Sequence, residues 1–229
     1  MKSEERLGLV RTLAVTGLAA LPLVSAACGA KPAVPDAPSP AASVAIIGPA
    51  RLDARQLVAW FNGRQPQPAG SYSASVDLAA IAQHYIEEGA AESVTGDIAF
   101  VQAIVETGWF RFTGTVPASA NNFAGIGAAD VNPGPATFAD ARTGVRAHIQ
   151  HLRAYGDPAA TTCTAPPLRN PCVDPRFHLV VPKGRAAAWN QLGSGNWATA
   201  PRYGANILSL YHEALVFNGV REAPASHGR

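Results

Sequence analysis

The sequence lacks any concentration of charge of one sign. Its 229 residues include 18 Lys and Arg against 16 Asp and Glu, a formal net charge of +2, and contain no basic block. Nucleic-acid binding therefore has no electrostatic support, because proteins that bind it neutralise phosphates with clustered Lys and Arg. No internal repeat is visible either. Apolar residues make up 48% of the chain, which is enough for the core of one medium-sized domain.

The N-terminal uncharged stretch is too short to cross a membrane comfortably, which takes about 20 residues. It runs from Thr12 to Ala27 and follows Lys2, Arg6 and Arg11. This length, after a charged start, is typical of the apolar core of a signal peptide.

Cysteine is scarce, and the first of the three follows this stretch directly. Small residues precede it in Val24-Ser25-Ala26-Ala27-Cys28-Gly29, which resembles a bacterial lipobox although Ser25 stands where leucine is commoner. Cys28 is therefore predicted to become the lipidated first residue of the mature protein. The alternative is ordinary cleavage at an Ala-x-Ala site, which would release a secreted protein. Either outcome places the chain in the cell envelope, outside the cytoplasm.

The other two cysteines, Cys163 and Cys172, lie close together in a proline-rich segment. Outside the cytoplasm such a pair is expected to form a disulfide. A loop this short would give about 2–3 kcal/mol in the chain-entropy description. Metal binding is the weaker alternative, because His178 is the lone further candidate ligand. No metal is therefore expected.

The chain divides into four predicted parts. Residues 1–28 form the signal peptide with its lipobox, and the Ala- and Pro-rich residues 29–50 form an extended tether. Residues 51–218 form the domain, and residues 219–229 a loose tail. Within the domain, helical spacing of apolar residues is found over residues 51–62, 77–88, about 97–106, 140–155, a short stretch ending at 193, and from about 203.

The helix that ends at Glu106 is the most informative of these. Its predicted apolar stripe consists of Ile98, Val101, Ile104 and Val105. Glu106 lies just beyond the stripe, with Gln102 and Trp109 as its neighbours on the helix surface. A carboxyl beside apolar and aromatic surface tends to keep its proton, as a general acid must. A solvated surface glutamate is the alternative. Three other acids, Glu87, Glu88 and Glu92, are interpreted as a solvated helix face.

Four motifs in a fixed order carry a more specific signal. They are Glu106-Thr107-Gly108-Trp109, Asn121-Asn122-Phe123-Ala124-Gly125-Ile126, the helix opening Phe138-Ala139-Asp140, and Trp197-Ala198-Thr199-Ala200-Pro201-Arg202-Tyr203-Gly204. Together, over roughly residues 77–218, they resemble the glucosaminidase domain of glycoside hydrolase family 73, the bacterial peptidoglycan N-acetylglucosaminidases. The chain departs from the family pattern at Ala124, which separates the aromatic residue from Gly125, and at Ala200, where Asp is commoner.

The resemblance implies a mainly α, lysozyme-like domain with at most a small β-hairpin lobe. In the family this lobe faces the catalytic glutamate. Here the corresponding segment, between Gly125 and Phe138, is so short that only a tight hairpin or a loop fits. Asp140 is expected to cap the helix that follows it.

The resemblance also suggests which residues carry the chemistry. Glu106 is predicted to be the general acid that protonates the glycosidic oxygen. Tyr203 matches the family's tyrosine near the catalytic glutamate, where it would orient the acetamido group or stabilise positive charge on the sugar; core packing is its alternative role. Asp130 is the candidate for positioning water, with a turn before Asn132-Pro133 as the alternative. The substrate's own N-acetyl group could assist instead.

Substrate contacts are predicted from Trp109, Asn121, Asn122, Phe123 and Trp197. The aromatic residues would stack on sugar rings or pack in the core, and the asparagines would contact substrate or hold their turn. The two helical histidines, His148 and His151, are given no catalytic role.

The function expected from the sequence is an exported endo-β-N-acetylglucosaminidase that hydrolyses the β-1,4 glycan of peptidoglycan without a cofactor. Its partners would be peptidoglycan strands and, through Cys28, the membrane. The chain is expected to be monomeric, although no residue pattern fixes the oligomeric state. The alternatives are a muramidase or lytic transglycosylase on the same scaffold, and a non-catalytic peptidoglycan-binding lipoprotein.

Overall fold

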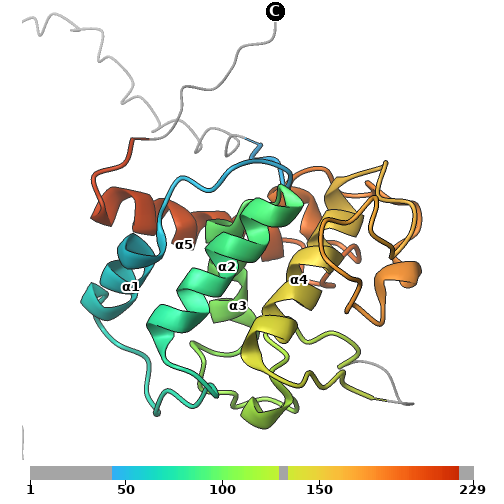
Figure 1. Ribbon diagram of the computed structural model, residues 1–229. Coiled ribbons are helices and arrows are strands. Elements are labelled where there is room, and N and C mark those ends of the chain that lie inside the picture. Colours follow the sequence, from blue (N-terminus) through green and yellow to red (C-terminus); the bar gives the residue numbers. More distant parts are fainter. Residues whose placement is uncertain (1–42, 129–133, 222–229) are drawn as a thin grey trace, which may run out of the picture. The chain divides into compact units, whose positions relative to one another are not determined.

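Helices make up nearly all regular structure in the computed structural model, which describes residues 43–128 and 134–221. The α-helices are α1 (Ala54–Gly63), α2 (Leu78–Glu92), α3 (Gly96–Glu106), α4 (Ala141–Gly156) and α5 (Tyr203–Phe217), and the short 3-10 helices are η1 (Ala118–Ala120), η2 (Phe177–Leu179) and η3 (Trp189–Leu192). The described ranges contain no β-strand, only two isolated bridges. The predicted mainly α architecture is confirmed (Figure 1).

Four parts of the sequence prediction lie outside the described residues. They are the signal peptide with Cys28, most of the tether, Asp130, and most of the tail, of which residues 222–229 are not described. Among the residues that the structure does describe, no helix is both long and apolar enough to cross a membrane.

Aspartates start three of the helices. The side chain of Asp53 accepts a hydrogen bond from the amide of Gln56 in a capping box, and Asp77 caps α2 through the amide of Ala80. Asp140 accepts from the amide of Thr143 at 2.8 Å, so the predicted cap of α4 is confirmed. Each carboxylate satisfies an amide that the helix itself leaves unpaired.

Helix α3 lies at the centre of the helix packing and contacts α2, α4 and α5 (Figure 1). Residues 96–104 are all buried, so the helix is enclosed on every side rather than along the single stripe that the sequence predicted. Only Val105 and Glu106, at its C-terminal end, reach the surface. Close packing against α2 depends on glycine: a Cβ on Gly89 would lie 2.6 Å from the Cα of Gly96.

Residues 44–48, predicted as the end of the tether, pack on the domain. The amide of Ile46 donates to Ala187, the carbonyl of Ile46 accepts from Thr95, and the Ile46 side chain is fully buried. The Thr95 hydroxyl also donates to Ile46 and accepts from the indole of Trp189. The packed part of the chain therefore begins before Arg51.

The interface between α2 and α4 contains buried charge. Glu88 pairs with Arg142 and Arg146, and Glu92 pairs with Arg153 at 2.8 Å. Glu88 and Glu92 are 1% and 0% exposed. The interpretation of these two acids as a solvated face was wrong, because α4 supplies arginines opposite them; only Glu87 is exposed.

Glu92 also holds the segment that carries the cysteines. Its carboxylate accepts hydrogen bonds from the backbone amides of Arg169 and Asn170, at 3.0 Å each. The sulfur atoms of Cys163 and Cys172 lie within disulfide-bonding distance, with their Cα atoms 5.3 Å apart. The buried carboxylate thus joins α2, α4 and this loop.

We expect Glu92→Ala to lower the free energy of unfolding by about 3–5 kcal/mol, because it leaves Arg153 and two amides without their buried acceptor. Chemical denaturation at neutral pH measures this loss. Arg55→Ala is the matched control, since its pair with Asp53 is solvent-exposed and spans 3.8 Å. A Glu92→Ala loss no larger than that of the control would contradict a structural role for this ion pair.

Candidate active site

Glu106 is the last residue of α3, and its carboxyl is held from one side only. Its Oε1 accepts a hydrogen bond from the indole Nε1 of Trp197 at 3.1 Å and another from the Tyr203 hydroxyl. Among the described residues no hydrogen bond reaches Oε2, which lies near Gly125: a Cβ there would be 3.6 Å away. The residue is partly exposed. One oxygen is therefore fixed. The other faces the turn formed by residues 121–126, which we call the Asn-Asn turn.

The surroundings of Glu106 favour its protonated form. Burial raises the pKa of the carboxyl above its ordinary value, and this effect exceeds the opposing effect of the hydrogen bonds from Tyr203 and Trp197. A carboxyl of this kind retains its proton to higher pH than a solvated glutamate, which is the property required of a general acid.

The chain reverses immediately after Glu106. Gly108, Trp109 and Phe110 adopt consecutive left-handed backbone conformations, with φ of 58°, 63° and 55°. Such angles are unfavourable for large L residues and persist only where the surroundings enforce them. Thr107 provides one constraint, since its hydroxyl donates to the carbonyl of Ala103 and accepts from the amide of Phe110. Phe110 is fully buried and provides another.

Trp109 packs beside this reversal. Its ring centroid lies 5.9 Å from that of Trp60 and 5.2 Å from that of Phe61, and the Arg64 guanidinium sits 4.7 Å from it. The ring is partly exposed. These neighbours leave only part of the indole available as a sugar-stacking surface.

The Asn-Asn turn is built by its own side chains. Asn122 donates to the carbonyls of Ile126 and Ala136 and accepts from the amide of Ile126, and Asn121 donates to the carbonyl of Phe138. These bonds account for the turn-holding role that the sequence left open for the asparagines.

Phe123, in the same turn, is fully buried against Phe110 and Phe112. Its packing is that of a core residue, which the sequence had left as the alternative to sugar stacking. The part of the turn that approaches Glu106 is Gly125, whose φ is 63°.

Trp197 is held by three rings of α4. Its indole lies 5.6 Å from His148, 5.2 Å from His151 and 5.5 Å from Tyr155, measured between ring centroids. His151 in turn pairs with the buried carboxylate of Asp174 at 2.7 Å. The rings fix the direction in which the indole donates to Glu106.

The sequence prediction missed three residues behind Tyr203. The Tyr203 hydroxyl accepts from Gln102 Nε2 at 2.8 Å, Gln102 Oε1 lies 3.0 Å from His148 Nε2, and His148 Nδ1 lies 2.8 Å from the hydroxyl of Tyr85. All three are fully buried. The one sequence signal for these residues was the helical spacing that places Gln102 beside Glu106. The hydrogen bonds to His148 of α4 and Tyr85 of α2 join parts of the chain that are far apart in sequence.

Among the described residues, no second carboxylate is hydrogen-bonded to Glu106 or is among the groups that shift its pKa. Asp140 is used as the cap of α4, and Asp130 lies outside these ranges. The described part of the chain also holds no cluster of three His, Cys, Asp or Glu side chains that could bind a metal ion.

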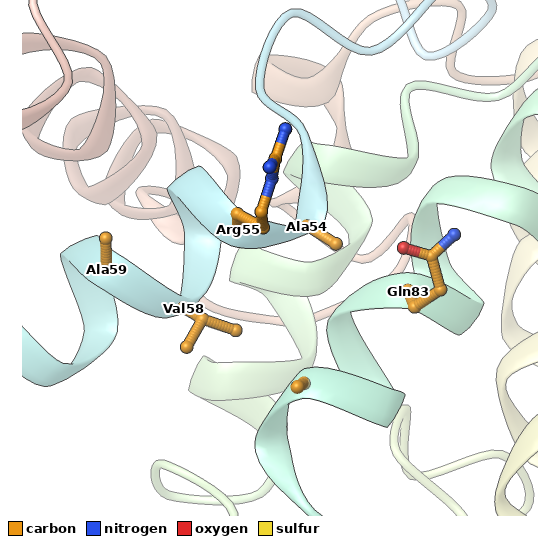
Figure 2. A pocket seen from close by; sticks show the side chains of 6 residues that line it. Ala54, Arg55, Val58, Ala59 and Gln83 are labelled. Atoms are coloured by element: carbon orange, nitrogen blue, oxygen red, sulfur yellow. The ribbon is translucent and has the colours of Figure 1, made fainter.

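A separate groove of about 300 Å³ lies between α1 and α2. Its lining residues are Ala54, Arg55, Val58, Ala59, Ala79 and Gln83 (Figure 2). It includes no carboxyl group and shares no residue with the Glu106 site, so it offers no acid for glycosidase chemistry.

Residues 82–215 match the glucosaminidase family, described as mannosyl-glycoprotein endo-beta-N-acetylglucosaminidase. This match covers more than half of the chain. The chain belongs to the glucosaminidase family. The matched range contains Glu106 and the residues that hydrogen-bond to it, so the family domain and the candidate site coincide. A glycosidase type of function is supported on this basis.

A relative of this glucosaminidase domain is an uncharacterized protein of Borreliella burgdorferi. The two are 34% identical over 143 residues, which cover 62% of this chain and 66% of the relative. The chain thus spans about two thirds of the length of the curated relative that it matches. No solved structure matches the chain.

We expect the stability of Glu106→Gln, measured relative to the wild type, to increase as pH rises. The folded state raises the pKa of Glu106, so the stability contributed by the protonated carboxyl is present at acid pH and is lost as pH rises through that pKa. Glutamine stays neutral and avoids this loss. Melting temperatures of both proteins over a pH series measure the difference.

The control for this series is Glu87→Gln on the exposed face of α2. It should not reproduce the gain. A Glu106→Gln difference that stays constant, or falls, from acid to neutral pH would contradict the raised pKa.

Proposed function

We propose that this glucosaminidase domain hydrolyses the β-1,4 glycan of peptidoglycan on the reducing side of N-acetylglucosamine, with Glu106 as general acid. The observation that carries the proposal is the asymmetric carboxyl: Oε1 is held by Trp197 and Tyr203, while Oε2 has no partner among the described residues. A partly exposed acid with a raised pKa has the two properties that protonation of a leaving oxygen requires.

In this mechanism Glu106 protonates the glycosidic oxygen as the bond to the anomeric carbon breaks. The carboxylate that results is stabilised by the donors already bound to Oε1, the Trp197 indole and the Tyr203 hydroxyl. Because these donors are in place before the reaction, no reorganisation is needed when the charge appears. Tyr203 is proposed also to face the acetamido group of the substrate, and Trp109 and Trp197 to form the aromatic border of its binding site.

The mechanism also needs a group that activates water. Asp130 is the proposed carboxylate, and assistance by the substrate's N-acetyl group is the alternative that needs no second acid. A lytic transglycosylase is the second candidate function, because the described residues present a single carboxyl to the site. The two functions differ in their products.

Glu106→Gln should abolish release of soluble fragments from purified peptidoglycan while leaving the protein folded. General acid catalysis typically contributes about 10²–10⁴-fold, so residual activity should be at most about 1%. Mass spectrometry after borohydride reduction identifies the products: reduced N-acetylglucosamine ends support the proposal, and anhydro-muramyl ends support the transglycosylase. The matched control, Glu87→Gln, should retain full activity.

If the folded wild-type protein binds peptidoglycan and releases no fragments, the chain is a wall-binding module. Full activity in Glu106→Gln would remove Glu106 from the acid role.

We also propose that the protein is exported and anchored through lipid on Cys28. The support is the uncharged stretch that ends in small residues before this cysteine. A labelled fatty acid fed to expressing cells should appear in the wild-type protein and be absent from Cys28→Ser. A Cys163→Ser control should keep the label. Labelled Cys28→Ser protein would contradict the anchor.

A further inference from the structure

Behind the catalytic carboxyl runs a buried chain of hydrogen bonds that crosses four helices. It links Tyr85 of α2, His148 of α4, Gln102 of α3 and Tyr203 of α5 to Oε1 of Glu106. The first three members are 0% exposed. These three members have no solvent with which to exchange hydrogen-bond partners, so the direction of their bonds is set within the chain.

Each link can be oriented in only two ways. Burial lowers the pKa of His148 to about 3, so its ring is neutral and has one donor and one acceptor nitrogen. Gln102 likewise has one donating and one accepting end. If one link reverses, all the links must therefore reverse.

The far end of the chain selects one direction. The hydroxyl of Tyr85 is fully buried, and its described partner is His148 Nδ1. In one direction Tyr85 donates to His148 Nδ1, so the buried Tyr85 proton has an acceptor. In the reverse direction the Tyr85 proton has no described acceptor, which is the more costly arrangement. Tyr85 is therefore the first donor.

From Tyr85 the donors follow in order. His148 Nε2 donates to Gln102 Oε1, Gln102 Nε2 donates to the Tyr203 hydroxyl, and that hydroxyl must donate onward to Glu106 Oε1. The Trp197 indole, which can only donate, points to the same oxygen. Both acceptor positions of Oε1 are then occupied.

We propose that Tyr85, His148 and Gln102 are positioning residues that oblige Tyr203 to donate to Oε1 and thereby assign the transferable proton of Glu106 to Oε2, on the Gly125 side. The proposal rests on the proposed function of Glu106. It places the glycosidic oxygen of the bound substrate on the Gly125 side of the carboxyl, where Gly125 offers no side chain.

The groups around Glu106 allow this chain to be tested through the acid itself. Among the described residues, the titratable side chains linked to it through this chain are Tyr85 from α2, His148 from α4 and Tyr203 from α5. The pKa values of both tyrosines are raised well above the ordinary range by burial, and that of His148 is lowered, so all three stay neutral while Glu106 titrates. The bond from Tyr203 holds the pKa of Glu106 down, and weakening that bond should move it up.

The test compares Tyr85→Phe and Gln102→Leu with the wild type in the full protein. Neither variant changes a group bonded directly to Glu106. We expect the basic limb of the pH profile of kcat to shift to higher pH by roughly one unit. The value of kcat at the optimum pH should fall roughly tenfold, with KM unchanged. Tyr203→Phe is the reference for complete loss of the bond and should shift the limb at least as far.

The matched control is Tyr72→Phe, which loses a single hydrogen bond, to the carbonyl of Val76, and lies outside the chain. It should leave the limb and kcat unchanged. Circular dichroism and melting curves show whether each variant folds. If Gln102→Leu fails to fold, Tyr85→Phe decides. Folded variants whose limb coincides with that of the wild type would overturn the positioning role.

A measurement independent of turnover separates this proposal from the proposed function. In protein carrying ¹³C-labelled glutamate, the Glu106 carboxyl resonance is identified by its absence in Glu106→Gln, and its titration midpoint is read by NMR. An upward shift in Tyr85→Phe supports the chain even if Glu106→Gln proves active. No shift, in an enzyme that needs Glu106, overturns the chain and leaves the catalytic assignment intact.

Discussion

The enclosure of α3 by α2, α4 and α5 is the constraint on which the candidate site depends. A helix buried over residues 96–104 can expose a functional group only at its end, and Glu106 occupies that end. The surrounding helices also supply the partners of the carboxyl: α5 begins with Tyr203, and α4 holds Trp197 through its aromatic face. The acid is thus oriented by elements distant in sequence, and its environment is as fixed as the core itself.

The same helices are joined by buried polar groups as well as by apolar packing. Glu88 and Glu92 of α2 bind arginines of α4, while His148 and Tyr85 link these two helices by a hydrogen bond. Buried charges are costly unless they are fully paired, so such contacts tolerate few alternative arrangements. The spacing between α2 and α4 is therefore set by directional bonds, and this spacing determines where Gln102 and Tyr203 meet.

Much of this organisation follows from sequence because it is local. Apolar spacing predicts the helices, Asp140 was predicted as the cap of α4, and the Glu-Thr-Gly-Trp and Asn-Asn motifs mark the C-terminal end of α3 and the turn near it. What periodicity could not predict is the partner across an interface. Periodicity describes a single helix and carries no information about the helix packed against it. For this reason Glu88 and Glu92 were interpreted as solvent-exposed, and His148 was given no role. Residues 44–48 looked like tether because their partners, Ser93, Thr95 and Ala187, lie far along the chain.

The docking of residues 44–48 has a mechanical consequence. Ile46 is bonded to Thr95, at the N-terminal end of α3, whereas Glu106 is at the C-terminal end. An 11-residue helix rises about 1.5 Å per residue, so the two ends are about 16 Å apart. Tension applied through the preceding chain reaches the domain at the end of α3 remote from the acid, and the rigid helix separates that load from the carboxyl. If the chain is anchored as proposed, such tension would leave the geometry of the Glu106 carboxyl undistorted.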